Sequence, residues 1–153
     1  MDTFSVLAWR KGEIGFVLGV LVLILGVSGL QLRVGQMKTR DAQRKADVEL
    51  VGRALTVYLE DHQILPAAAE GRIAACGYLR SEGCEWGRDA IADGEGVVYL
   101  KKLPIDPFDF ARGWKYVYST NKERTKYKIC VNLEYKADKQ FKNDIQCNWY
   151  AGN

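Results

Sequence analysis

Apolar residues are unevenly distributed along the chain, and the most apolar stretch runs from Ile14 to Leu32. None of these 19 positions carries a charge, and 13 of them are Leu, Ile, Val or Phe. As an α-helix the stretch would extend roughly 28 Å at about 1.5 Å per residue, close to the thickness of a bilayer's hydrocarbon core. We therefore predict a transmembrane helix over 14–32, preceded by a short cytoplasmic leader over 1–13.

Two other interpretations of this stretch are open. A cleaved signal peptide usually has an apolar region of about 7–15 residues, which is shorter, and its cleavage site would be the weak small-residue sequence Val27-Ser28-Gly29. A buried core helix would need a protein large enough to cover it on every face. Length and composition favour a retained anchor.

The segment after the apolar stretch predicts a continuation of the helix. No proline occurs between Arg33 and Leu65, and apolar residues recur there at steps of three and four. Asp41 and Arg44 interrupt this stripe, which is apolar at both ends. From Val48 onward the stripe widens, as in a helix that lies on a folded domain. We predict an amphipathic continuation of the helix over 33–64.

The first part of this continuation, residues 33–47, is mostly charged or small. Such a composition predicts a segment that crosses open space before the helix reaches the domain. The alternative to one long helix is an ordinary anchor followed by a separate surface helix, with a kink near Gly35.

The remaining residues, 65–153, predict a domain with short elements. Alternation of aromatic and polar residues indicates strands, and Asn121 lies in a turn between two of them. Together with the preceding helix, this pattern predicts an α+β fold in which a long helix packs on a small antiparallel β-sheet. The expected elements are a short helix or loop over 67–73, a short helix over 88–92, a strand or helix over 97–102, and strands over 114–118, 126–133 and 145–150.

Four cysteines, Cys76, Cys84, Cys130 and Cys147, lie in this domain without a C-x-x-C spacing. The single histidine, His62, cannot complete a zinc site with them. Four cysteines behind an apolar segment predict two disulfides in an oxidising compartment. Three pairings are open, of which the sequential one closes the shortest loops. Four buried thiols in a cytosolic domain are the alternative.

Charge and composition argue against two classes of function, nucleic-acid binding and catalysis. The 22 basic and 19 acidic side chains leave a net charge of +3, which gives little support to a nucleic-acid binder. One histidine and four serines argue against histidine-based catalysis, and no carboxylate pair is singled out as hydrolytic, so we expect no enzyme. The basic stretch 33–45 has acids interleaved with it, which favours a solvated helix face over contact with headgroups or DNA.

The flanking charges and the cysteines disagree on topology. The positive-inside rule places the more basic flank of a transmembrane helix in the cytoplasm, which here is the C-terminal side. The cysteines argue for an oxidising compartment on that same side. The basic residues before the apolar stretch are Arg10 and Lys11, and those after it are Arg33, Lys38, Arg40, Arg44 and Lys45.

Several further segments stand in a fixed order: a basic leader ending in Gly15-Phe16, the apolar helix, Thr39–Asp47, Tyr58–Pro66, and Tyr99–Pro107 with the sequence YLKKLPIDP. Taken in this order they resemble the type IV pilin and type II secretion pseudopilin superfamily. Thr39–Asp47 is similar to a common helix segment of that superfamily. Tyr58–Pro66 is similar to its Y-x-D-x-G-x-Y-P pattern, and Tyr99–Pro107 to the YLKKLPxDP element of major pseudopilins.

The resemblance implies a C-terminal domain outside the cytoplasm and a leader cut between Gly15 and Phe16 by a prepilin peptidase. It also implies lipid as a partner and assembly with copies of itself or with other pilin-like subunits. In the family, a glutamate at the fifth position of the mature helix pairs with the amino terminus of a neighbouring subunit, and Val20 stands there in this chain. Polar contacts between subunits are therefore expected from Asp41 and Arg44.

Some members of that superfamily bind calcium near the C-terminal loop, and calcium takes hard oxygen ligands. No EF-hand order is present, and solvated loop acids are the alternative, so we expect no firmly bound cofactor. The weak calcium candidates are Asp138, Asn143 and Asp144, and further acids close by in the sequence are Glu134, Asp106 and Asp109.

These observations favour a membrane-anchored, pilin-like structural subunit of a type IV pilus or a type II secretion-like filament. It would cross the membrane once, with its N-terminus in the cytoplasm. The first alternative is an uncleaved anchor that displays a disulfide-bonded binding module outside the cytoplasm and does not assemble. The second is an extracytoplasmic enzyme.

Overall fold

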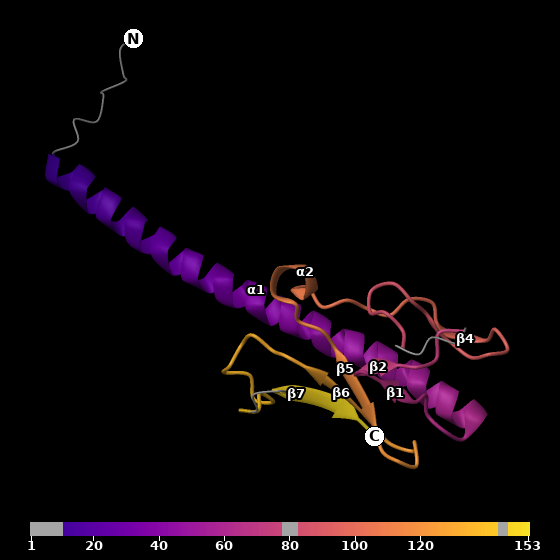
Figure 1. Cartoon of the computed structure of the whole chain (residues 1–153). Coiled ribbons are helices and arrows are strands. Elements are labelled where there is room, and N and C mark those ends of the chain that lie inside the picture. Colours follow the sequence, from indigo (N-terminus) through magenta and orange to yellow (C-terminus); the bar gives the residue numbers. More distant parts are fainter. Residues whose placement is uncertain (1–10, 78–82, 144–146) are drawn as a thin grey trace, which may run out of the picture. The chain divides into compact units, whose positions relative to one another are not determined.

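The computed structural model describes residues 11–77, 83–143 and 147–153 (Figure 1). By its internal contacts the chain divides into two compact units, one ending at Met37 and the other comprising Lys38–Asn153. Helix α1 spans Lys11–His62, so its second part belongs to the same unit as the strands that follow. The fold is α+β, with a long N-terminal helix packed against small antiparallel sheets.

Helix α1 passes through Gly35 without a break. It is therefore one helix, and not the anchor and separate surface helix that the sequence left open. A single glycine costs a helix about 1 kcal/mol, which its neighbours can offset. The helix ends two residues before the predicted position. Gln63 adopts a left-handed φ of 60°, and its N–H donates to the carbonyl of Leu59 at 2.8 Å. This conformation closes the last turn ahead of Pro66.

The apolar stretch of α1 in the first unit is not buried within the chain. The most apolar 18-residue window of the helix is fully unburied, and α1 is long and apolar enough, by length and composition, to cross a membrane. All 13 Leu, Ile, Val and Phe residues between Ile14 and Leu32 are exposed. Phe16, for example, is 74% exposed.

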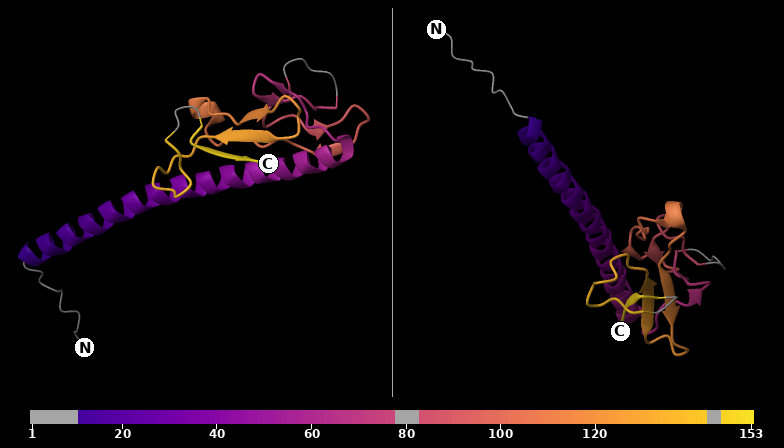
Figure 2. Two further views of the ribbon diagram at one scale, coloured as in Figure 1. Left: turned by 90° about the horizontal axis from the view of Figure 1, so that it is seen from below. Right: turned by 90° about the vertical axis from the view of Figure 1, so that its left-hand side faces the viewer.

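The second unit contains three small antiparallel sheets (Figure 2). The largest has the strand order β5-β6-β7, and Tyr118 of β5 faces Ile129 of β6 in its register. The other two are the pairs β1-β2 and β3-β4. The strands are β1 (Ala68–Ala69), β2 (Arg72–Ile73), β3 (Ile91–Ala92), β4 (Val98–Leu100), β5 (Val117–Thr120), β6 (Tyr127–Val131) and β7 (Trp149–Gly152), and a short helix α2 (Asp109–Arg112) precedes β5.

The core of this unit joins one face of α1 to the three-stranded sheet. Val48, Val51 and Leu55 recur at helical spacing, and all three are fully buried in one cluster with sheet residues such as Tyr118 and Ile129. The widened stripe that the sequence predicted from Val48 onward is therefore the packed face.

Gly52 of α1 lies against a side chain of the three-stranded sheet. A Cβ atom added to this glycine would lie 2.6 Å from the hydroxyl of Tyr127 in β6. No side chain larger than hydrogen fits there unless the tyrosine moves, so the position fixes the spacing between the two elements.

Two of the short elements differ from expectation, and a third, left open by the sequence, is a strand. Residues 67–73 form the hairpin β1-β2, because Glu70 and Gly71 both adopt a left-handed φ, as a two-residue hairpin turn requires. The helix expected over 88–92 is wrong: Ile91 and Ala92 form strand β3, whose burial against β4 outweighs local helix preference. The undecided segment 97–102 contains strand β4.

All four cysteines form disulfides, Cys76–Cys84 and Cys130–Cys147, so the sequential pairing is the one adopted and free thiols are excluded. Cys130 lies in β6 and Cys147 just before β7, so the second bridge closes the 17-residue connection between neighbouring strands. A loop of that size is stabilised by about 3 kcal/mol in the chain-entropy model.

Candidate functional site

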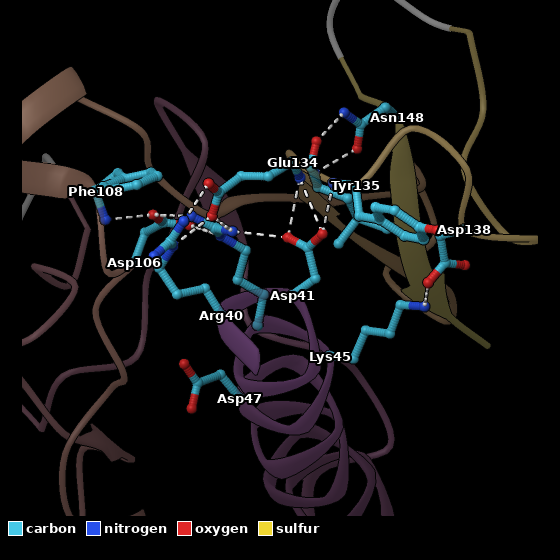
Figure 3. Close-up of polar contacts among 12 residues, drawn as sticks. Arg40, Asp41, Lys45, Asp47, Asp106, Phe108, Glu134, Tyr135, Asp138 and Asn148 are labelled. Carbon is cyan, nitrogen blue, oxygen red and sulfur yellow. Dashed lines mark hydrogen bonds and ion pairs between the residues drawn. The ribbon is translucent and has the colours of Figure 1, made fainter. Parts of the chain in front are cut away.

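Arg40 and Asp41 of α1 lie beside Asp106 and Glu134 in the second unit (Figure 3), and Arg44 of the same helix bonds to three of these residues. Its side chain is fully buried and donates to Asp106 at 2.7 and 3.1 Å. It also donates to Asp41 and to Glu134, each at 2.8 Å. We call Arg40, Asp41, Arg44, Asp106 and Glu134 the Arg44 cluster.

Arg40 and Asp41 extend the contacts of this cluster to the segment after β6. Arg40 donates to both carboxylate oxygens of Glu134 at 2.7 Å, a bidentate pair. The Asp41 carboxylate accepts from the backbone N–H groups of Glu134, at 2.9 and 3.1 Å, and of Tyr135, at 2.8 Å. Helix α1 is thereby bonded directly to a loop more than 90 positions away in the chain.

An aromatic layer covers the guanidinium groups. The guanidinium carbon of Arg40 lies 4.7 Å from the ring centre of Phe108, and that of Arg44 lies 5.1 Å from the ring centre of Trp114. The backbone N–H of Phe108 donates to Asp106 at 2.7 Å. Cation–π contacts strengthen when the cation is desolvated, as the fully buried Arg44 is. Three separate segments of the chain meet at Arg44.

The cluster holds two cations and three carboxylates, and backbone N–H donors solvate the excess negative charge. Burial alone would lower the pKa of Arg44, but the hydrogen bonds to its three carboxylate partners outweigh it and raise that pKa. Burial alone would raise the pKa of Glu134, yet the hydrogen bonds from Arg40 and Arg44 lower it. Arg44 and Glu134 therefore stay charged at neutral pH, and the ion pair between them persists there.

The expected roles of Asp41 and Arg44 change accordingly. Both were expected to meet opposite charges on a neighbouring subunit, but both are buried and bonded within their own chain, at 2% and 0% exposure. The expectation that residues 33–47 cross open space is also wrong for this part of the helix, because the Arg44 cluster packs it on the domain.

Two of the three weak calcium candidates, Asp138 and Asn143, lie among the described residues. Asp138 accepts from Lys45 at 2.9 Å, and Lys45 holds the pKa of that carboxyl below its usual value. Asp106 is bonded to Arg44 and Asn143 is exposed, whereas Asp144 lies outside the described residues. Among the residues that the structure describes, no group of three or more His, Cys, Asp or Glu is placed to hold a metal ion.

The proposed processing residues lie in the first unit. Gly15 and Phe16 are in the second turn of α1, and a Cβ added to Gly15 would meet nothing within 4 Å. Phe16 is largely exposed.

A second polar group lies at the other end of the packed helix, around His62. Its Nε2 atom is 3.2 Å from the Tyr99 hydroxyl and 3.4 Å from the Asp93 carboxylate. The Tyr99 hydroxyl donates to Asp61 at 3.0 Å, and burial together with this carboxylate raises the tyrosine pKa. These contacts tie the end of α1 to the β3-β4 pair.

A cavity of about 430 Å³ opens beside this group, lined in part by Tyr58, Cys76 and Asp93. Asp93 is buried at 6% exposure. Burial alone would raise the pKa of Asp93, but the backbone N–H groups of Val97 and Glu95 outweigh it and lower that pKa. The cavity thus presents an aromatic ring and an ionised carboxylate.

No protein-family model matches the chain, and the comparisons with curated proteins and with solved structures likewise give no match.

Sequence reasoning found Asp41 and Arg44 as exceptions on an apolar stripe but missed their partners. A charge on a face that becomes buried must be paired, so a charged residue within an apolar stripe indicates that a partner exists. It does not say which one. Asp106 and Glu134 stood out in the sequence as loop acids and Trp114 as the start of a predicted strand, whereas Phe108 was not singled out. The fold brings them to one place.

Proposed function

We propose that this protein is a membrane-anchored, pilin-like structural subunit of a type IV pilus or a type II secretion-like filament. The observation that carries the proposal is the composition of α1, which joins an uncharged, fully exposed apolar segment to a packed segment of a disulfide-bonded domain. An exposed apolar surface of this kind needs an apolar environment outside the chain.

The disulfides support the orientation of this subunit. Disulfides persist in oxidising compartments, so the domain that contains them lies outside the cytoplasm and the N-terminus inside it. The Arg44 cluster supports a structural role, because its bidentate bonds attach the helix to two loops of the domain.

Photocrosslinking in native membranes tests assembly. Leu50 and Val57 lie seven positions apart on the solvent side of α1, at 39% and 49% exposure, where a filament would place a neighbouring subunit. A benzophenone amino acid at either position should give a ladder of crosslinked copies. The same group at the exposed Lys122, in the β5-β6 turn, is the matched control and should crosslink far less.

The mature N-terminus tests processing independently. Mass spectrometry of membrane fractions should find a chain that begins at Phe16. A chain that begins at Met1 would indicate a static anchor, and one that begins near Leu30 would indicate ordinary secretion. Either result, together with the absence of a crosslinked ladder, would contradict the filament proposal.

The cavity beside Asp93 favours a second candidate function, an anchored binding module that does not assemble. Its volume lies within the range of ligand sites, about 300–1,000 Å³, and its lining combines an aromatic ring with a charge. This function predicts a monomeric chain in the crosslinking experiment. It also predicts that Asp93→Asn abolishes capture of a cationic ligand without changing membrane association.

A further inference from the structure

One end of the second unit presents a set of side chains that the Arg44 cluster does not use. The helix residues at this end begin with Lys38, which follows Leu32, the last apolar residue of the predicted span, by six positions. Two loops contact the helix here, one leading into α2 and one following β6. Figure 1 shows α2 at this end of the unit and β4 at the other.

Phe110 in α2 is the most exposed large apolar side chain of the unit. It is 93% exposed, whereas the other exposed large apolar residues of this unit lie between 39% and 53%. Its neighbour Phe108 packs on Arg40, which fixes the position of α2 beside the helix. The ring of Phe110 is thus held out from the domain by a well-anchored segment.

The charges that face outward at this end are basic. Lys38, Arg112 and Lys136 are exposed, and Lys38 lies 4.7 Å from the ring centre of Tyr135. Arg112 lies 4.2 Å from the ring centre of Phe108.

The acids at this end are mostly turned inward. Glu134 and Asp106 bond to Arg44, and Asp138 bonds to Lys45. Asp109, at the start of α2, is half-buried. The exposed surface therefore combines an aromatic side chain with cations.

We propose that this basic aromatic surface, formed by Lys38, Phe110, Arg112, Tyr135 and Lys136, rests on an anionic lipid membrane. Aromatic and basic side chains together are typical of the membrane interface, where rings enter the headgroup region and cations meet lipid phosphates. Lys38 follows the last residue of the predicted span by six positions, so the chain enters this surface soon after the span ends. The proposal rests on the membrane anchor of the proposed function, but not on filament assembly.

A photoreactive side chain at position 110 tests the contact in the full-length protein. A benzophenone amino acid there replaces one exposed aromatic ring by another, and the same group at Val98, in β4, is the matched control. The protein is reconstituted in phosphatidylcholine vesicles containing phosphatidylglycerol, and lipid adducts are measured by mass spectrometry. We expect at least about fivefold more adduct at position 110 than at position 98.

The charge contribution is measured with the same probe. Arg112→Gln with Lys136→Gln should lower the adduct at position 110, and so should vesicles of phosphatidylcholine alone, because the attraction to anionic headgroups is lost. If the adduct yield at position 110 is the same after the double substitution and in phosphatidylcholine vesicles, the electrostatic part of the proposal is overturned.

Equal yields at positions 110 and 98, or no lipid adduct at either, overturn the contact itself. Adducts to another protein in native membranes at position 110, in place of lipid, also overturn it. Carbonate extraction separates the two proposals: a chain that resists extraction but gives no adduct at position 110 retains its anchor and lacks the contact. A chain that carbonate releases contradicts the anchor, and the contact with it.

Discussion

The two parts of α1 have the same backbone conformation and opposite surroundings. In the first, every Leu, Ile, Val and Phe between Ile14 and Leu32 is exposed, and the stretch has no charge. In the second, from Lys38 onward, one face is buried, and its charged residues Asp41 and Arg44 are buried with it. Apolar residues around the whole circumference suit a lipid surrounding, whereas a one-sided stripe suits a folded domain.

The two parts of this single helix therefore suit two different surroundings. Packing with the sheet and the Arg44 cluster stabilises the second part, so changes there should affect unfolding of the domain. The first part has no such partners among the described residues, so changes there should affect membrane association and leave the domain intact. The predictions below separate the two effects.

The largest effect is expected for Arg44→Ala. Removing one member of a buried ion-pair group leaves the carboxylates uncompensated and costs about 3–5 kcal/mol. Denaturant unfolding of the detergent-solubilised protein, followed by tryptophan fluorescence, measures the loss. Arg53→Ala, at an exposed position of the same helix, is the control and should change the unfolding free energy by less than about 0.5 kcal/mol. Equal losses in the two variants would refute the role of the Arg44 cluster.

A charge in the first part should act on the membrane instead. Leu23→Arg places a cation at the middle of the span, where insertion costs about 2.5–3.5 kcal/mol. We expect most of the variant to be lost from the carbonate-resistant membrane fraction, while its unfolding midpoint in detergent stays unchanged. Leu23→Ile is the control. A lower unfolding midpoint of Leu23→Arg with normal membrane retention would contradict the expectation that the first part of α1 acts on membrane association and not on the domain.

Alanine substitutions at two glycines of α1 should give smaller changes in stability, and the two changes should have opposite signs. At Gly52, an added methyl group collides with the Tyr127 hydroxyl, so Gly52→Ala should lose about 1 kcal/mol after the gain in helix propensity is included. At Gly35, a Cβ meets nothing within 4 Å, so Gly35→Ala should gain up to about 1 kcal/mol of helix stability. Thermal unfolding followed by far-ultraviolet circular dichroism measures both. Changes of the same sign would show that helix–sheet spacing at Gly52 is unimportant.

The smallest effect is a dependence on acid that should be confined to the second unit. The pKa of Glu134 lies below its ordinary value of 4.5, because hydrogen bonds from Arg40 and Arg44 outweigh burial. A carboxyl with a depressed pKa stabilises the fold above its ordinary value, and the contribution is lost as the pH falls through the lowered pKa. Asp138, paired with Lys45, acts in the same direction, whereas burial raises the pKa of Asp47 and partly opposes them.

Unfolding midpoints between pH 6 and pH 3 test this dependence, with the pH range set by ordinary carboxyl values of about 4. The midpoint of the wild-type protein should fall more steeply below pH 4.5 than that of Glu134→Gln. Membrane association should not change over the range, because residues 14–32 contain no titratable side chain. An identical acid profile in the variant would remove Glu134 as its source.

Much of the architecture followed from local pattern. The apolar stretch and the three-and-four stripe predicted one long helix with two surfaces. The strand predicted over 126–133 contains β6, whereas those predicted over 114–118 and 145–150 overlap β5 and β7 by two residues each, and residues 145 and 146 lie outside the described residues. Predictions failed where local preference was weak. Residues 88–92 have a composition that suits a helix, and the strand at Ile91–Ala92 forms because β4 lies beside it.

The candidate site could be predicted in part for the same reason. Asp41 and Arg44 stood out because a charge on a face that is apolar at both ends is anomalous, and the cysteines stood out because their number and spacing suit disulfides. The bonding of the two charges within their own chain was not predicted, because the sequence gives no indication of which loop folds back over them.

The sequence by itself determined the helix, the uncharged span and the cysteines available for bridges, because each depends on neighbouring residues along the chain or on composition. The tertiary structure alone decided that Asp106 and Glu134 meet Arg44, across separations of 62 and 90 positions. It also decided that Gly52 is where the sheet approaches the helix. Contacts within a helix recur at steps of three and four, whereas a contact between distant segments exists only after the chain has folded around a common core.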